Sequence, residues 1–490
     1  MKVSLDTLPF RNTFAALPTA FYSRVTPTPF ESEAHLIHFN TAAAELLGLD
    51  PAVQHDPRFL AAFSGQQPLP GMDPIAMLYA GHQFGHYVPQ LGDGRAIILG
   101  ELTNPRGEKW ELQLKGCGQT PYSRQGDGRA VLRSSIREYL AGEAIHGLGI
   151  PTTRALCLIG GRDEVYREQI ETGAMITRIA PSHVRFGSFE VFYYREQYDH
   201  IRTLADYVID QHYPELADQP DRYLQFLNEV VERTANLMAQ WQAVGFAHGV
   251  MNSDNMSILG LTLDYGPYGF LEAYNPGFIC NHSDHSGRYA FDQQPQIGLF
   301  NLSCLAQALL PLIEVEDAKA ALSAYWSDFT APYHRMMARK IGFEQADEPA
   351  IKLLESLLAQ MQQSRTDYTR LFRALGDVQR DGENTPAALR DLFVDREAFD
   401  GWLADYRARL RTHAKPDAER RAVMMATNPK YILRNYLAQA AIEKAERGDY
   451  AEIDRLLTVL RTPFDEQPNA EAYAAPPPDW ADNIQVSCSS

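Results

Sequence analysis

Cysteine is scarce in this sequence of 490 residues, and its placement argues against two common classes of site. The five cysteines include no CxxC pair, so neither a zinc module nor a disulfide framework is predicted. With so few thiols, a reducing compartment is expected. The cysteines are Cys117, Cys157, Cys280, Cys304 and Cys488.

Long apolar runs are also lacking. Residues 1–6 contain no apolar signal core, and no Arg-rich presequence follows them. The longest apolar stretch, 297–315, is interrupted by Asn301, Ser303, Gln307 and Glu314, which favours a buried helix over a membrane span. We therefore expect a soluble, cytoplasmic protein without a membrane partner.

Basic charge is in deficit, because 62 acidic residues against 45 basic ones leave a formal net charge of −17. Such a field repels polyanions, so no nucleic-acid partner is predicted, although a local basic pocket for one nucleotide is compatible with it. The hydrophobic fraction of 45% and the charged fraction of 22% are typical of a folded protein.

The patterns along the chain predict an α+β protein in four parts. Residues 1–75 are rich in proline and are expected to form an irregular lead-in. Residues 76–185 predict one helix over 128–147 and strands at 95–102, 109–115, 153–158, 165–168 and 173–179. Residues 186–473 predict helices at 222–244, 299–331, 350–375, 396–410 and 431–447. Residues 474–490 are expected to form an extended tail.

Polar residues follow one another in the order that kinase-like phosphate chemistry requires. Lys115 ends the strictly alternating segment 109–115, and Glu138 lies in the middle of the predicted helix. Asp264 follows a long helix, the stretch 247–255 (AHGVMNSDN) and a short apolar hairpin. In kinase-like enzymes a strand lysine contacts the phosphates, a helix glutamate holds that lysine, and loop Asn and Asp residues bind the metal. The order predicts a bilobal, protein-kinase-like fold with a small β-rich N-lobe and a larger, mostly helical C-lobe.

The predicted catalytic loop departs from the kinase pattern H-x-D-x-x-x-x-N. Aligning His248 and Asn255 with that pattern places Val250 where the proton-accepting aspartate belongs. Valine cannot accept a proton, and Asp254 is the nearest carboxylate that could replace it. Spacing alone leaves a second interpretation open, in which Asp254 only caps the loop.

Two arginines and two histidines admit more than one interpretation. Arg178 and Arg185 flank the predicted lobe junction and could clamp a polyphosphate bidentately, or form surface salt bridges. His282 and His285 flank Asp284, but two histidines without a third ligand are more often ordinary loop residues than a metal site.

Long motifs in this chain resemble those of the selenoprotein O family. The resemblance runs over nearly the whole chain and implies a pseudokinase that binds ATP in an inverted orientation and transfers AMP to protein hydroxyls. The terminal Cys488 stands where selenium-containing members carry selenocysteine. The motifs are 112–124 (LQLKGCGQTPYSR), 126–130 (GDGRA), 248–255 (HGVMNSDN), 264–267 (DYGP), 281–284 (NHSD), 428–431 (NPKY) and 488–490 (CSS).

Carried over residue by residue, the resemblance implies a complete nucleotide site. Lys115, Arg178 and Arg185 would hold the outer phosphates, with Glu138 positioning the lysine. Asn255 and Asp264 would ligate Mg²⁺ (or Mn²⁺), with Asp264 also contacting the nucleotide, and Asp254 would accept the proton. The rest of the nucleotide site would consist of Gly92, Gly94, Arg95, Asp127 and Gly128.

The predicted activity is therefore AMP transfer from ATP to Ser, Thr or Tyr hydroxyls of protein substrates, with release of pyrophosphate, by a monomer. Cations around the leaving group suit this chemistry because they stabilise charge where it develops. The alternatives are UMP transfer from UTP, phosphotransfer with a relocated base, and a non-catalytic nucleotide-binding scaffold. We also expect a reversible Cys280–Cys488 disulfide that tunes activity.

Overall fold

An eight-stranded antiparallel sheet organises the first 180 residues of the computed structural model, which describes residues 4–382, 386–412 and 415–487. β8 (Ala130–Val131) pairs with β10 beside the main path of the sheet. In spatial order the other strands are β1 (Tyr22–Arg24), β3 (Ile75–Met77), β6 (Ala96–Thr103), β7 (Lys109–Lys115), β10 (Ile170–Ala180), β9 (Arg154–Tyr166) and β2 (His35–Phe39).

The side chains of β7 separate the apolar face of this sheet from its polar face. Leu112 and Leu114 point into an apolar cluster shared with α1 (Thr41–Leu46) and α2 (Pro57–Phe63). On the opposite face Lys115 reaches α3 (Leu132–Gly147). Strict alternation in the sequence predicts this division, because successive strand residues point to opposite faces.

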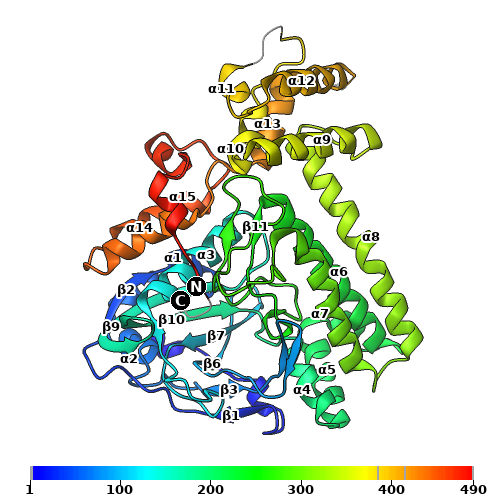
Figure 1. The fold of residues 1–490 in the computed structure, drawn as a ribbon. Coiled ribbons are helices and arrows are strands. Elements are labelled where there is room, and N and C mark those ends of the chain that lie inside the picture. The colour runs from blue at the N-terminus through cyan, green and yellow to red at the C-terminus, as the bar shows by residue number, and fades with distance from the viewer. Residues whose placement is uncertain (1–3, 383–385, 413–414, 488–490) are drawn as a thin grey trace.

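Helices form most of the remaining chain, and Figure 1 shows them beside and above the sheet. Two short hairpins, β4 (Gly81–Gln83) with β5 (His86–Val88) and β11 (Phe246–Ala247) with β12 (Gly269–Phe270), lie between the larger elements. The first group of helices is α4 (Gly187–Tyr194), α5 (Tyr198–His212), α6 (Arg222–Val244), α7 (Gln294–Leu309) and α8 (Val315–Lys340). The second group is α9 (Glu348–Ser364), α10 (Tyr368–Leu375), α11 (Ala387–Arg390), α12 (Arg396–Arg411) and α13 (Asp417–Thr427).

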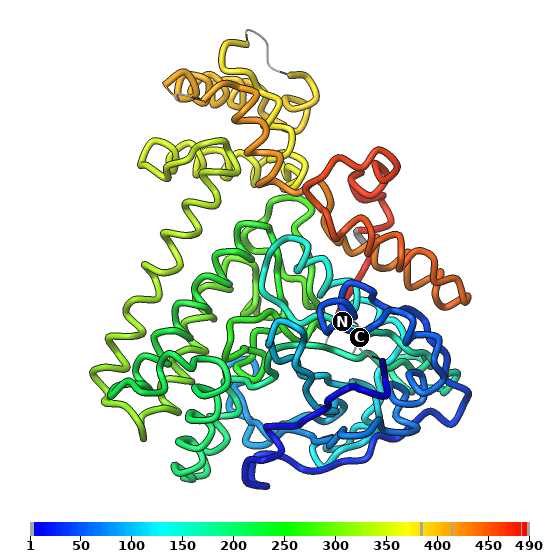
Figure 2. The backbone as a smooth tube through the Cα atoms, turned by 180° about the vertical axis from the view of Figure 1, so that it is seen from behind, coloured from blue at the N-terminus to red at the C-terminus, as the bar shows by residue number. Residues whose placement is uncertain are grey.

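The C-terminal helices α14 (Asn435–Ala445) and α15 (Ala451–Arg461) return to the sheet and pack against α3. Figures 1 and 2 show them, in orange and red, beside the blue and cyan region. Arg461 Nη2 donates to Asn40 Oδ1 at 2.9 Å, and His35 Nε2 lies 2.9 Å from the Tyr450 hydroxyl. The two ends of the chain thus stabilise the same side of the sheet.

The prediction of an irregular lead-in is wrong, because residues before 75 supply β1, β2, α1 and α2. Proline misled it. Pro57 occupies the first turn of α2, where Asp56 caps the helix by accepting from Arg58 N, and proline is favoured at that position. β2 pairs with β9, more than a hundred residues away, so no local pattern marks it.

Several predicted elements form with different bounds. The helix predicted at 299–331 is two helices, α7 and α8, because Pro311 has no N–H to continue the helical hydrogen bonds beyond Leu310. The helix predicted at 350–375 ends at Ser364, because the capping residue Arg365 has a left-handed φ of 50°, and α10 begins at Tyr368. The strand predicted at 165–168 is the end of β9. The prediction of 222–244 matches α6.

The described part of the C-terminal tail, up to Ser487, packs on the protein. Residues Asp479–Asn483 form a 3₁₀ turn, and Trp480 packs edge-on against Tyr436. Val486 is buried, and its carbonyl accepts from His282 N at 2.8 Å. The expectation of a disulfide to Cys280 involves Cys488, which lies outside the described residues. In the part of the chain that the structure describes, no helix combines the length and apolar content that crossing a bilayer requires.

Candidate active site

A cavity of about 580 Å³ lies where the sheet meets the loops around residues 250–267. Its volume is that of a small-molecule site. Glu138 stands directly behind the lining, bonded to Lys115. The lining includes the other residues that the sequence predicts for a nucleotide and metal site: Gly92, Gly94, Arg95, Lys115, Asp127, Gly128, Arg178, Arg185, Asp254, Asn255 and Asp264.

Glu138 joins two cations at the back of the cavity. Its Oε2 accepts from Lys115 Nζ at 2.6 Å and its Oε1 accepts from Arg178 Nε at 2.5 Å. Burial favours the neutral carboxyl, but the charges of Arg178 and Lys115 outweigh it and hold the pKa of Glu138 below its ordinary value. Burial lowers the pKa of Lys115 to about 8, against the opposing effect of Glu138. At neutral pH the group remains an ionised glutamate between two cations.

Strand register explains why Arg178 belongs to this group. Arg178 on β10 pairs with Gln113 on β7, so its side chain shares the polar face with Lys115. Arg178 Nη1 also donates to Gln113 Oε1 at 2.9 Å, which fixes the plane of the guanidinium group.

Asp264 forms ion pairs with two arginines, Arg178 on β10 and Arg185 just after it. Its Oδ1 lies 2.8 Å from Arg178 Nη2, and its Oδ2 accepts from Arg185 Nη1. Burial alone would raise its pKa, but Arg185, Arg178 and Lys115 hold the pKa of Asp264 well below its usual range. Asp264 has a φ of 59°, which is uncommon for a residue with a side chain. This backbone turn presents an ionised carboxylate to both arginines.

Asp254 lies in the 3₁₀ turn Ser253–Asn255 and is 6% exposed. Gln83 Nε2 donates to its Oδ2 at 3.2 Å, whereas its Oδ1 has no hydrogen-bond partner among the described residues. Burial raises the pKa of Asp254 to about 7, although Arg185 opposes the shift. A carboxyl group of this kind can accept a proton near neutral pH. Next to it, Asn255 Nδ2 donates to Val250 O at 3.0 Å, which leaves the amide oxygen as its available metal ligand.

A family model described as "Protein adenylyltransferase SelO" matches residues 4–461 of this chain. The chain belongs to the SelO family. Relatives described as "Protein nucleotidyltransferase YdiU" agree with this assignment over 99% of the chain. The relative from Myxococcus xanthus (strain DK1622) is 58% identical over 488 residues, and the one from Thiobacillus denitrificans (strain ATCC 25259 / T1) is 59% identical over 490 residues; both are covered over 100% of their length. Membership of the SelO family makes this protein a nucleotidyltransferase.

Several polar residues at the cavity were not predicted from the sequence, and two of them contact predicted site residues. Gln83 on β4 contacts Asp254, and Arg167, just beyond β9, forms an ion pair with Asp127 at 2.7 Å. The glycine-punctuated segment around Gln83 signals a turn but no chemistry. Arg167 lies in a polar hairpin end with no motif around it, so only the folded chain reveals its place.

The histidines of the predicted loops serve the fold. The His248 ring stacks on Trp241, with 5.3 Å between ring centroids, and its Nε2 lies 2.9 Å from Leu263 O. The Asp284 carboxylate between His282 and His285 accepts from the backbone N–H of Arg288 and Tyr289. Asp284 is therefore used in capping the loop, in keeping with the ordinary-loop interpretation.

A larger hollow of about 980 Å³ lies on another side of the sheet. Its lining includes Lys109, His146 and His212 but no residue of the predicted site. The 580 Å³ cavity remains the better candidate, because acidic, basic and metal-ligating side chains converge there.

Proposed function

We propose that this member of the SelO family transfers AMP from ATP to Ser, Thr or Tyr hydroxyls of protein substrates and releases pyrophosphate. One observation carries the proposal. Asp254, a buried carboxyl with one oxygen that no described residue bonds, faces the same cavity as three cations grouped around Glu138 and Asp264. Nucleotidyl transfer to a hydroxyl needs a group that accepts the hydroxyl proton and a cluster that binds the polyphosphate, and this cavity offers both.

The cation cluster suits a pyrophosphate leaving group. Lys115, Arg178 and Arg185 are nearly buried, and their positions are fixed by Glu138 and Asp264. Donors that are already ordered and poorly hydrated stabilise developing negative charge without reorganisation. The guanidinium group of Arg185 also lies over the Tyr79 ring, 4.7 Å from its centroid, which further restricts its motion.

Asn255 and Asp264 supply a suitable pair of ligands for Mg²⁺ or Mn²⁺. The Asp264 carboxylate is ionised and the Asn255 amide oxygen is available, and hard divalent cations prefer such oxygen ligands. When bound, the metal would neutralise phosphate charge at the reacting group. Gly92, Gly94, Arg95, Asp127 and Gly128 would complete the nucleotide site.

Asp254 would take the proton from the acceptor hydroxyl. Its unpartnered Oδ1 is the available acceptor atom, while Gln83 holds Oδ2. Val250 also lines the cavity but has no atom that accepts a proton. The catalytic loop would therefore carry its base at Asp254.

The finer architecture that we propose is a bilobal, protein-kinase-like fold. Residues 76–185 would form the N-lobe, 186–473 the helical C-lobe and 474–490 the tail, with residues 1–75 completing the N-lobe sheet. Support comes from the cavity, which lies between the Lys115 strand and the loop of Asp254 and Asp264. We propose that the protein acts as a monomer on other proteins.

Labelled ATP distinguishes the possible activities. The purified protein is incubated with a candidate protein substrate and with ATP labelled at the α- or the γ-phosphate. We expect protein labelling from α-labelled ATP only, and its loss in Asp254→Asn, which preserves side-chain shape. Labelling from γ-labelled ATP would instead establish phosphotransfer.

A parallel reaction with α-labelled UTP tests the UMP-transfer alternative. The scaffold alternative predicts no labelling from any nucleotide, with nucleotide binding intact. Asp73→Asn serves as the matched control, because Asp73 lies outside this cavity in an exposed ion pair with Arg24.

A further inference from the structure

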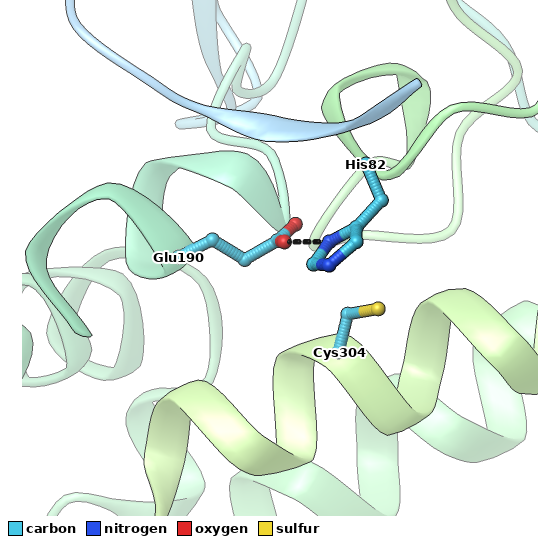
Figure 3. A group of neighbouring side chains, drawn as sticks. All are labelled: His82, Glu190 and Cys304. Carbon is cyan, nitrogen blue, oxygen red and sulfur yellow. Dashed lines mark hydrogen bonds and ion pairs between the residues drawn. The ribbon is translucent and has the colours of Figure 1, made fainter. Parts of the chain in front are cut away.

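Three side chains with metal-ligating atoms meet outside the nucleotide cavity. His82 comes from β4, Glu190 from α4 and Cys304 from α7, and one ligand atom of each lies within 4.8 Å of the others. Figure 3 shows the imidazole ring of His82 between the carboxylate of Glu190 and the thiol of Cys304. Three separate elements thus converge on one point.

Glu190 gives this cluster an unsatisfied acceptor. Its side chain is 0% exposed, and its Oε2 lies 2.6 Å from His82 Nδ1. Its other oxygen, Oε1, has no hydrogen-bond partner among the described residues. Leaving a buried charged acceptor without a partner destabilises a fold. A cation held at this position would remove that penalty.

The donor set selects the kind of cation. An imidazole nitrogen, a carboxylate oxygen and a thiolate sulfur suit a borderline-soft, tetrahedral ion such as Zn²⁺, whereas Mg²⁺ prefers oxygen ligands alone. The carboxylate and a thiolate together balance the two positive charges of Zn²⁺. Three protein ligands and one water molecule complete a tetrahedron.

We propose that His82, Glu190 and Cys304 form a Zn²⁺ site. On binding, the Cys304 S–H proton passes to solvent as the sulfur–zinc bond forms. Zinc replaces the hydrogen bond between His82 and Glu190 with a bond to each residue. No CxxC pair announces this site, because its ligands are more than a hundred residues apart and are assembled only by folding.

The surroundings suit a site that is enclosed but reachable. The rings of Tyr87 and Phe300 lie 5.4 and 5.8 Å from the His82 ring, centroid to centroid. These rings shield the cluster from bulk water. The His82 side chain keeps 12% exposure, which leaves a path for an ion.

The zinc site would be mechanically connected to the catalytic loop. His82 N donates to Ser253 Oγ at 2.7 Å, and the next residue, Gln83, donates to Asp254. An ion that fixes His82 against Glu190 and Cys304 therefore also fixes the strand that supports the turn Ser253–Asn255. Zinc binding itself does not depend on the proposed AMP transfer.

Co²⁺ is the probe for this site, because a cobalt–thiolate bond gives an intense charge-transfer band in the near ultraviolet. The full-length protein is freed of metal with a chelator and titrated with Co²⁺ and then with Zn²⁺. We expect the band to saturate at one Co²⁺ per chain and to be abolished by one equivalent of Zn²⁺ but not by Mg²⁺. Asn255 and Asp264 offer oxygen ligands only and cannot produce this band.

Variants test whether the cobalt–thiolate band arises from binding at His82, Glu190 and Cys304. Cys304→Ser should remove it, whereas Cys280→Ser, at a partly buried cysteine elsewhere in the fold, should keep it. Glu190→Gln and His82→Asn should each weaken Co²⁺ binding by more than the roughly 10–100-fold that loss of an outer-shell partner causes. Thermal unfolding of each metal-free variant reports whether it is folded, and a misfolded Cys304→Ser leaves the decision to the other two variants.

Three results would overturn the proposal. The first is the absence of a thiolate band in the wild-type protein at one equivalent of Co²⁺. The second is a band that persists at full strength in folded Glu190→Gln and His82→Asn, and the third is a band that disappears in Cys280→Ser, because in both cases the ion would bind elsewhere.

Discussion

Replacing Asp264 by asparagine should weaken the fold and strengthen the binding of pyrophosphate to the metal-free protein. Asp264 is the carboxylate partner of Arg185 and one of two for Arg178. Asparagine keeps the side-chain shape and removes the charge. Arg178 keeps Glu138, so Arg185 is the cation left buried without a carboxylate.

The expected loss of stability follows from this arrangement. Breaking a buried ion pair by removing one partner costs about 3–5 kcal/mol. The lower figure applies here, because the Asp264 side chain is 21% exposed. At about 2.1 cal/mol/K per residue, the unfolding entropy of 490 residues is about 1 kcal/mol/K. A loss of about 3 kcal/mol therefore lowers the unfolding midpoint by about 3 °C.

Thermal scans in a chelator, with and without pyrophosphate, test both halves of the prediction. A tenfold gain in pyrophosphate affinity adds about 1.4 kcal/mol of ligand stabilisation, and hence about 1.4 °C more midpoint shift in the variant than in the wild type. Asp73→Asn is the control, since Asp73 lies outside the cavity, is 39% exposed in its pair with Arg24, and exposed pairs contribute at most about 1 kcal/mol. An unchanged midpoint in Asp264→Asn would contradict the predicted cost of leaving Arg185 without a carboxylate. Equal midpoint shifts with pyrophosphate in variant and wild type would refute the assignment of these arginines to the leaving group.

Three further changes test other parts of the molecule. Asp254→Asn should reduce AMP transfer by about 10²–10⁴-fold while sparing ATP binding, as initial rates with α-labelled ATP and equilibrium dialysis would reveal. Gly81→Ala would bring a Cβ within 2.7 Å of Asp254 Oδ1, and the displaced base should slow transfer about a hundredfold in the same assay. Burial lowers the pKa of Lys340 from 10.5 to about 7, so the charged lysine destabilises the native state fully below pH 7 and progressively less towards pH 10.5. Lys340→Met should thus increase the free energy of unfolding in urea by about 4 kcal/mol at pH 6 but by only about 1 kcal/mol at pH 9.5. A gain in stability that is independent of pH would contradict the lowered pKa of Lys340.

Elements with one buried face could be predicted, because such a face requires apolar residues at regular intervals in the sequence. The alternation of 109–115 predicted both β7 and the face that carries Lys115. The apolar periodicity of 222–244 predicted α6. Short edge strands gave no such signal, because the three residues of β1 are ordered by pairing with β3 rather than by their own pattern.

The candidate site likewise contains residues that could be predicted from the sequence and contacts that could not. Lys115, Glu138 and Asp264 could be found from their order along the chain, since kinase-like chemistry requires those types in that order. That Arg178 bonds Glu138 and Asp264 at once could not be predicted, because it depends on the register of β10 against β7. Gln83 reaches Asp254 across 171 positions of sequence, a contact that only the tertiary fold creates.

The charge distribution around the cavity resolves the apparent conflict between an acidic protein and a polyanionic substrate. Burial raises the pKa of Asp254 to about 7, which lessens the negative charge of the lining near neutral pH. Seven basic residues line the cavity against four aspartates: Arg95, Lys115, Arg124, Arg129, Arg167, Arg178 and Arg185 against Asp93, Asp127, Asp254 and Asp264.

This local excess of positive charge lies within a chain of net charge −17. Charges more than about 8 Å apart are largely screened at physiological salt, so a nucleotide inside the cavity experiences chiefly its lining. A polynucleotide would extend beyond the cavity and meet the acidic remainder of the protein. The same sequence can therefore attract one polyphosphate and repel a polymer of them, and the attraction should weaken as salt concentration rises.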